Sequence, residues 1–128
     1  DVLSVNILMA VSEVLCPVAL QGPALEGLKT FFGYLMSAQR LNLELQLKYI
    51  LPTMFDQRTH HSFNILRQLR RLFHKQICDP IRYNVRLSEA AVRGRTIFEY
   101  RNSAGSAEDY GKLLWRVQHD GQKDQKIA

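Results

Sequence analysis

The sequence predicts an α/β protein with a partial doubly wound, mostly parallel sheet that is flanked by helices. Two short and nearly continuous apolar runs, at residues 13–20 and 45–54, are typical of strands that are covered on both faces. Between them, residues 24–40 carry apolar side chains at helical spacing. A strand, a helix and a second strand in this order imply a right-handed parallel crossover.

Three further segments are predicted to be helical. Apolar residues recur at helical spacing in residues 2–11 and again in residues 58–77. The apolar stripe of the second segment consists of Phe63, Leu66, Leu69, Phe73 and Ile77. Ser106 and Asp109 resemble a capping box that opens a last helix. After Gly121 the chain is polar, so we expect one domain over residues 1–121 and a frayed polar tail over residues 122–128.

A short third strand is predicted at residues 81–83, followed by a polar loop. Asn84 tolerates turn geometry, and Ser88 can cap a helix that begins at Glu89. Loops at the carboxyl ends of strands line the ligand crevice of open α/β sheets, so this loop is a candidate binding edge. An ordinary connection between a strand and a helix is the alternative. Residues 96–100 are predicted to extend along the sheet, and residues 102–105 to form a loop.

Four short sequence motifs give information that the spacing of apolar residues does not. Residues 81–90 contain N-V-R-L-S-E-A, residues 24–28 read A-L-E-G-L, residues 51–59 read L-P-T-M-F-D-Q-R-T, and residues 107–110 read A-E-D-Y. In order and spacing these blocks resemble the ParA-type partition ATPases, the deviant P-loop family that includes the MinD-like proteins. The resemblance covers nearly the whole chain up to about Gln118, and it implies the carboxyl-terminal half of a P-loop NTPase fold.

The resemblance implies ATP or ADP with magnesium as the cofactor of the full-length protein. In the family, a Gly-rich loop with lysines and a magnesium-organising Asp precede the region matched here, and neither occurs in this chain. Three strands with one unpaired edge likewise argue that further strands are missing. Phosphoryl transfer needs the missing groups, and no arrangement of His, Ser or Cys replaces them. We therefore expect no catalytic or metal-binding residue, no tight nucleotide binding and no activity from the chain alone.

By resemblance, two loops flank the adenine. The first is Thr53-Met54 after the second strand, and the second is Arg82-Tyr83-Asn84 after the third. A planar side chain can stack on a purine, and Asn84 offers both a donor and an acceptor. Many relatives carry Pro-Arg where this chain has Arg82-Tyr83. The alternative for Tyr83 is a strand residue that packs against a helix.

A basic helix face is the second candidate surface. Basic residues recur at helical spacing within residues 58–77, and no acidic residue occurs between Asp56 and Asp79. The formal charge of the chain is +5, which allows nucleic acid or an anionic membrane as a partner. DNA phosphates can neutralise such a face, and the resemblance implies binding to non-specific DNA. A solvated basic face is the alternative. The candidate DNA-binding residues are Arg67, Arg70, Arg71, Lys75, Arg93, Arg95 and Arg101.

The function predicted from these features is that of the carboxyl-terminal portion of a plasmid- or chromosome-partitioning ATPase. The resemblance implies a cytoplasmic, nucleoid-associated homodimer that sandwiches ATP, grips non-specific DNA and responds to a ParB-like partner. One alternative is a MinD-like positioning ATPase, which needs an amphipathic tail helix that residues 121–128 do not offer. Another is a non-catalytic interaction module that lost the P-loop. No membrane partner is expected, because no run of about eighteen apolar residues occurs.

Overall fold

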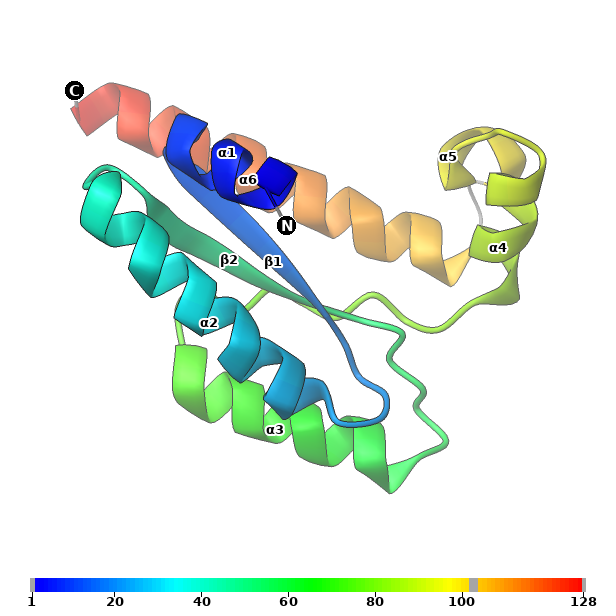
Figure 1. The fold of residues 1–128 in the computed structure, drawn as a ribbon. Coiled ribbons are helices and arrows are strands. Elements are labelled where there is room, and N and C mark those ends of the chain that lie inside the picture. The colour runs from blue at the N-terminus through cyan, green and yellow to red at the C-terminus, as the bar shows by residue number, and fades with distance from the viewer. Residues whose placement is uncertain (1, 102–103, 128) are drawn as a thin grey trace.

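The computed structural model describes residues 2–101 and 104–127, with side chains from residue 6 to residue 123, and has an α/β architecture (Figure 1). The described residues form six helices and two strands. In chain order they are α1 (Val2–Ala10), β1 (Glu13–Ala19), α2 (Ala24–Leu41), β2 (Gln46–Thr53), α3 (His60–Phe73), α4 (Val85–Val92), α5 (Ile97–Arg101) and α6 (Gly105–Ile127).

The two strands form the sheet, and α2 is the crossover between them. β1 and β2 pair in parallel from Glu13 opposite Gln46 to Ala19 opposite Thr53, with an irregularity between Val14 and Leu15. Both strands and the connecting helix lie where the apolar patterns predicted them. The strand–helix–strand unit is therefore confirmed, although a two-stranded sheet is too small to define a doubly wound arrangement.

The third strand predicted at residues 81–83 does not form as a regular strand. Residues 76–83 run beside β2, but parallel bridges occur only between Ile50 and Ile77 and between Phe55 and Arg82. The Ile50 amide donates to the Gln76 carbonyl at 3.0 Å, and the Cys78 amide donates back to the Ile50 carbonyl at 2.9 Å. The next two donors in this parallel alternation would be Pro52 and Pro80, which have no N–H. The Ile81 amide, one residue after Pro80, donates to the Pro52 carbonyl at 2.8 Å instead, so the ladder shifts register here before it continues to Phe55.

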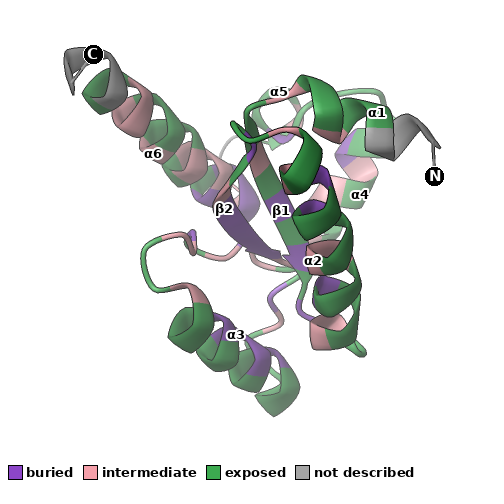
Figure 2. Cartoon of the chain, turned by 60° about the vertical axis from the view of Figure 1, so that its left-hand side comes forward, coloured by how far each residue is buried: buried purple, intermediate pink, exposed green. Residues whose placement is uncertain are grey.

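Helices cover both faces of β2, as the doubly apolar strand pattern predicted. Ile50 points into a cluster with Val18 of β1 and with Leu28, Leu66 and Leu69 of α2 and α3. Its neighbours on β2 point the other way, into a cluster that includes Ile81 and the partly buried Tyr110 and Leu113 of α6. In Figures 1 and 2, α2 and α3 accordingly lie on one side of the sheet and α6 lies on the other.

Helix α3 is shorter than the residues 58–77 predicted, and its buried face differs from the predicted stripe. The Thr59 side chain caps its start by accepting from the Ser62 amide at 3.3 Å, and the helix ends at Phe73. Ser62 faces the core because its hydroxyl donates to the Leu20 carbonyl at 3.0 Å. Phe63 is 44% exposed, so its place in the predicted stripe is wrong, whereas Leu66 and Leu69 are buried as predicted.

The helix starts after residue 83 also differ from expectation. α4 begins at Val85 and not at Glu89, because the Asn84 side chain accepts from the Arg86 amide at 2.9 Å and acts as the cap in place of Ser88. The segment predicted to be extended at residues 96–100 forms α5. Thr96 and Glu99 cap it reciprocally: the Thr96 amide donates to the Glu99 carboxylate at 2.9 Å, and the Glu99 amide donates to Oγ1 of Thr96 at 3.2 Å.

The last helix begins at Gly105 and continues to Ile127, through the tail that was predicted to fray. The predicted capping box at Ser106 and Asp109 is wrong. The Asp109 carboxylate accepts hydrogen bonds from Arg82, and the buried Ser106 hydroxyl has no hydrogen-bond partner among the described residues. Residues 102 and 103 of the predicted loop lie outside the described residues. Among the helices described, none has the length and apolar character that a membrane crossing requires.

Candidate functional site

A cavity of about 430 Å³ lies where the loop after β2, the segment before α4 and the first turn of α6 meet. The main chain joins the first two of these elements. The Phe55 amide donates to the Ile81 carbonyl at 3.0 Å, and the Tyr83 amide donates to the Phe55 carbonyl at 2.9 Å. The cavity is lined by Phe55, Asp56, Gln57, Arg58, Arg82, Tyr83, Asn84, Val85, Gly105 and Ser106.

Of the two loops that the family resemblance placed around a base, the second lines this cavity and the first does not. Arg82, Tyr83 and Asn84 line the cavity, but Thr53 and Met54 are not among its lining residues. The Thr53 carbonyl accepts from the Leu20 amide at 2.9 Å, which ties the end of β2 to the end of β1. Met54 has a positive φ of 53°, an uncommon conformation for a residue other than glycine. This turn at Met54 leads the chain to Phe55, where the cavity wall begins.

Asp56 and Arg58 stiffen the first loop of the cavity, and the sequence patterns assigned neither a role. Nε and Nη2 of Arg58 each donate to a carboxylate oxygen of Asp56 at 2.9 Å, and the Arg58 amide donates to the same carboxylate at 3.0 Å. These hydrogen bonds hold the pKa of Asp56 below its ordinary value. The D-Q-R-T stretch of the resembling block was the signal that could have identified the pair.

Arg82 is the most heavily bonded side chain at the cavity. Its backbone amide and its Nε donate to one carboxylate oxygen of the buried Asp109, at 2.9 and 3.0 Å, and Nη2 donates to the other at 3.0 Å. Nη2 also donates to the Gly105 carbonyl at 2.9 Å and to Glu108 at 3.3 Å. The hydrogen bonds to Asp109 hold the pKa of Arg82 above its ordinary value. The guanidinium therefore stays charged while it anchors the first turn of α6.

Tyr83 and Asn84 offer two different contacts to a ligand. Tyr83 lines the cavity and is 52% exposed. The side-chain oxygen of Asn84 accepts from the Arg86 amide as the helix cap. The amide nitrogen of Asn84 is a donor that this cap does not use.

The basic residues of α3 lie on its outer face. Arg67, Arg70 and Arg71 are exposed, as is Lys75 in the turn after the helix. Among the described side chains, none of the four takes part in an ion pair. The face opposite is held against the core by Ile65, Leu66 and Leu69. A helix face of one sign is thus presented to solvent.

The remaining predicted basic residues form a separate group around α4 and α5. Arg93, Arg95 and Arg101 are exposed, and the guanidinium of Arg93 lies 5.3 Å from the centre of the Tyr100 ring. Figures 1 and 2 both show α4 and α5 apart from α3, with the sheet between them. The seven candidate DNA-binding residues therefore do not form one continuous surface.

No metal centre is found in the part of the chain that the structure describes. No group of three or more His, Cys, Asp or Glu side chains there is arranged to hold an ion. Cys16 and Cys78 are free and buried, and burial raises the pKa of both thiols. Neither thiol is thus favoured as a thiolate.

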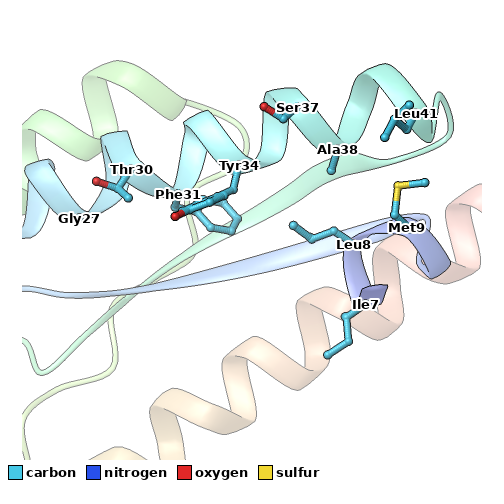
Figure 3. Close-up of a pocket in the computed structure, with 10 residues that line it drawn as sticks. All are labelled: Ile7, Leu8, Met9, Gly27, Thr30, Phe31, Tyr34, Ser37, Ala38 and Leu41. Carbon is cyan, nitrogen blue, oxygen red and sulfur yellow. The ribbon is translucent and has the colours of Figure 1, made fainter. Parts of the chain in front are cut away.

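A larger cavity of about 580 Å³ lies between α1 and α2 (Figure 3), but its chemistry is sparse. Figure 3 shows Leu8 and Met9 extending from α1 toward α2. The hydroxyls of Thr30 and Ser37 donate to carbonyls one turn earlier in α2, at 3.3 and 3.1 Å. None of the described residues that line this cavity is charged, so they offer no ion pair to a ligand.

Comparison with known proteins identifies relatives over most of the chain. No protein-family model matches it. It is 33% identical over 121 residues to the sporulation initiation inhibitor protein Soj of Bacillus subtilis, an alignment that covers 93% of this chain and 48% of that protein. It is 36% identical to the chromosome partitioning protein ParA of Myxococcus xanthus, covering 84% and 39%, and 35% identical to the chromosome-partitioning ATPase Soj of Thermus thermophilus, covering 90% and 47%.

The chain spans about half the length of the curated relatives it matches. The four sequence blocks therefore indicated the correct family, and the coverage is consistent with a carboxyl-terminal portion. The chain is a homologue of the Soj/ParA chromosome-partitioning ATPases and corresponds to about half of such a protein.

Proposed function

We propose that this chain supplies the base-binding side of a nucleotide site, and a DNA-contacting face, to a chromosome- or plasmid-partitioning ATPase. The observation that carries the proposal is the cavity at the carboxyl end of β2. Ligands of open α/β sheets bind at the carboxyl ends of strands, and homologues named as partitioning ATPases use a nucleotide by definition. Of the cavities in the described residues, this one combines that position with an exposed aromatic ring and charged groups.

The cavity suits the adenine of ATP but not its phosphates and magnesium. Its volume is in the range of small-molecule sites, and Tyr83 and Arg82 are planar groups on which a purine can stack. For the phosphates and magnesium, the sequence has no Gly-rich loop with a lysine, and the described residues hold no carboxylate cluster. ATP bound to the complete protein would supply the γ-phosphoryl group that is transferred to water. The residues of this chain bind and orient its base.

The basic face of α3 is proposed as the DNA contact. Arg67, Arg70, Arg71 and Lys75 are exposed without described carboxylate partners, so phosphates can neutralise them. A face of this kind contacts the DNA backbone and reads no sequence. We further propose, from the likeness to partitioning ATPases, that the complete protein acts at the nucleoid as an ATP-bound homodimer with a ParB-like partner.

Base binding is tested by ligand-observed saturation-transfer NMR of the chain with AMP. Saturation should be concentrated on the adenine protons, and Tyr83→Ala should reduce it at least several-fold because the exposed ring is removed. Tyr34→Ala is the matched control, since Tyr34 is similarly exposed but lies on α2, away from this cavity. Equal saturation in the Tyr83→Ala variant and the wild type would contradict the proposal, as would no saturation of AMP at all.

A further inference from the structure

The segment at residues 75–82 has an inner edge, which bonds β2, and an outer edge, which faces away from the sheet. On the inner edge, the Cys78 amide donates to the Ile50 carbonyl at 2.9 Å. The main-chain groups of successive residues in an extended chain point to opposite sides. Those of Ile77 and Asp79 therefore point to the outer edge. In the part of the chain that the structure describes, no strand pairs with this outer edge.

Two side chains of α6 bond to the main chain along the outer edge. The guanidinium of Arg116 donates from Nη1 to the Ile77 carbonyl and from Nη2 to the Lys75 carbonyl. Earlier in α6, the Asp109 carboxylate accepts from the Arg82 amide at 2.9 Å. This amide points outward, because the amides on either side of it donate to β2 and to the loop after β2. α6 thus runs along the outer edge in the opposite direction and bonds to both of its ends.

The stretch between these two contacts is bridged by α6 but not filled. Cys78 and Asp79 line a cavity of about 260 Å³, which side chains of α6 also line. Asp79 is exposed, and Pro80 after it has no N–H to offer to a neighbouring strand. Prolines, charged side chains and covering helices are the features that protect open sheet edges in proteins. The segment therefore protects its outer edge in part, and α6 adds to that protection.

Without the contacts from α6, the outer edge would present unpaired donors and acceptors on an extended segment. Ile77, Ile81 and Tyr83 are residues of types that favour strands. The partner that fits such an edge is the same edge of a second copy of the chain. A twofold axis places two identical edges side by side in opposite directions, and antiparallel pairing then satisfies the main-chain groups of both. Because β2 already holds the inner edge, the segment needs little further ordering to accept a strand.

We propose that α6 is an edge cap, in which Arg116 and Asp109 prevent a second copy of the chain from adding to the sheet at residues 75–82. This inference is independent of the nucleotide site and the DNA contact proposed above. The guanidinium of Arg116 occupies two carbonyls that an added strand would use. If Arg116 served only to hold α6 in place, its removal would lower stability without causing association.

The first test removes the donors and measures association. Arg116→Met eliminates the hydrogen bonds to both carbonyls, and we expect the association constant of the chain to rise about tenfold or more. Sedimentation velocity over a concentration series measures it. Lys112→Met removes the same charge from the same helix, from a side chain that pairs with Glu108 at 3.6 Å, and should leave association unchanged. Tyr49→Phe weakens the attachment of α6 but keeps Arg116, so it should lose stability without gaining association.

The second test identifies the edge that associates. In Arg116→Met, hydrogen exchange at residues 75–82 should slow as the protein concentration rises, whereas exchange in β1 should not change. Asp79→Pro removes an outward-pointing amide, so adding it to Arg116→Met should return association to the level of the wild type. If Arg116→Met does not fold, Arg116→Lys takes its place. It keeps a cation that can bond one carbonyl, and it should show a smaller rise in association.

Three results would overturn the edge cap. The first is a folded variant of Arg116 that associates no more than the wild type does. The second is equal association of Tyr49→Phe or Lys112→Met, since general loosening of α6 or loss of charge would then be the cause. The third is association that protects another part of the chain or persists after Asp79→Pro is added, because the outer edge would then not be the surface that pairs.

Discussion

The hydroxyl of Tyr49 donates a hydrogen bond of 2.6 Å to the carboxylate of Asp120 and so joins the middle of β2 to α6. Arg116, one turn before Asp120, lies over the same tyrosine ring at 5.2 Å and donates to the main-chain carbonyls of Lys75 and Ile77. This cluster attaches α6 both to the strand and to the turn that follows α3. The position of α6 should therefore depend on the protonation of Tyr49 and Asp120.

The pH dependence of stability should reflect this pair. Burial, and then the hydrogen bond to Asp120, raise the pKa of Tyr49 to about 12, above its ordinary value of 10.0. A folded-state pKa above the unfolded value gives stability that is complete below pH 10 and declines as the pH rises toward 12. Urea unfolding between about pH 8 and 12 should therefore show a decline in the free energy of unfolding that is smaller in Tyr49→Phe.

The hydrogen bond between Tyr49 and Asp120 should also contribute to stability at neutral pH. The hydrogen bond from Tyr49 holds the pKa of Asp120 below its ordinary value, so this carboxylate contributes stability above that value and ceases to do so as the pH falls. Tyr49→Phe removes the donor and should lower the free energy of unfolding at neutral pH by about 1–3 kcal/mol. An unchanged stability at neutral pH with an unchanged alkaline decline would show that the pair does not hold α6.

Two buried serines should respond in opposite ways to the removal of their hydroxyls. Ser62 donates to the Leu20 carbonyl at 3.0 Å, so Ser62→Ala leaves a buried carbonyl unpaired and should cost about 1–2 kcal/mol. Ser106 is equally buried, but its hydroxyl has no partner in the part of the chain that the structure describes. Ser106→Ala should consequently be neutral or stabilising. Thermal and urea unfolding of both variants measure the difference, and a cost at Ser106 as large as at Ser62 would contradict it.

The basic face of α3 should determine the salt dependence of DNA binding. Each basic side chain that neutralises a phosphate contributes roughly 0.9 to the slope of log affinity against log salt, so Arg67→Ala with Arg71→Ala should flatten that slope by about 2. Stability should change by less than about 0.5 kcal/mol, because both side chains are exposed. Fluorescence anisotropy with unrelated duplexes across a salt series measures the slope.

The control for that experiment removes the same charge elsewhere. Lys29→Ala with Arg40→Ala changes two basic residues of α2 and should leave the slope close to that of the wild type. Arg93→Ala with Arg101→Ala tests the separate group near α5 in the same way. Equal slopes for the α3 variant and the α2 control would identify the α3 face as merely solvated.

The chain by itself should neither bind ATP tightly nor hydrolyse it. Base stacking contributes only about 1–3 kcal/mol, and the sequence has no Gly-rich loop with a lysine to hold the phosphates. AMP and ATP should therefore bind with similar, weak affinity, since the additional phosphates meet no dedicated groups. Calorimetry that showed micromolar affinity for ATP would refute this expectation, and phosphate release in a steady-state assay would refute the second part.

Local sequence patterns predicted much of the fold and part of the candidate site. The alternation and period of apolar residues predicted β1, α2 and β2 and the parallel crossover, because these elements bury continuous apolar surface and have little choice of partner. The N-V-R-L-S-E-A block pointed to a loop that lines the cavity, whereas the Thr53-Met54 loop taken from the other block does not line it. Thr96 and Glu99 have the spacing of a capping box, yet residues 96–100 were predicted to be extended and form α5 instead.

Only the tertiary structure decided which side chains near these loops form hydrogen bonds, and with which partners. Asp109 matches the spacing of a helix cap, yet it bonds Arg82, which lies 27 residues earlier in the chain. Pro52 and Pro80 interrupt a ladder only because β2 and residues 76–83 align in a register that places both at donor positions. Local patterns record preferences within a few residues, whereas hydrogen bonds between distant residues are chosen by the packing that brings their donors and acceptors into reach.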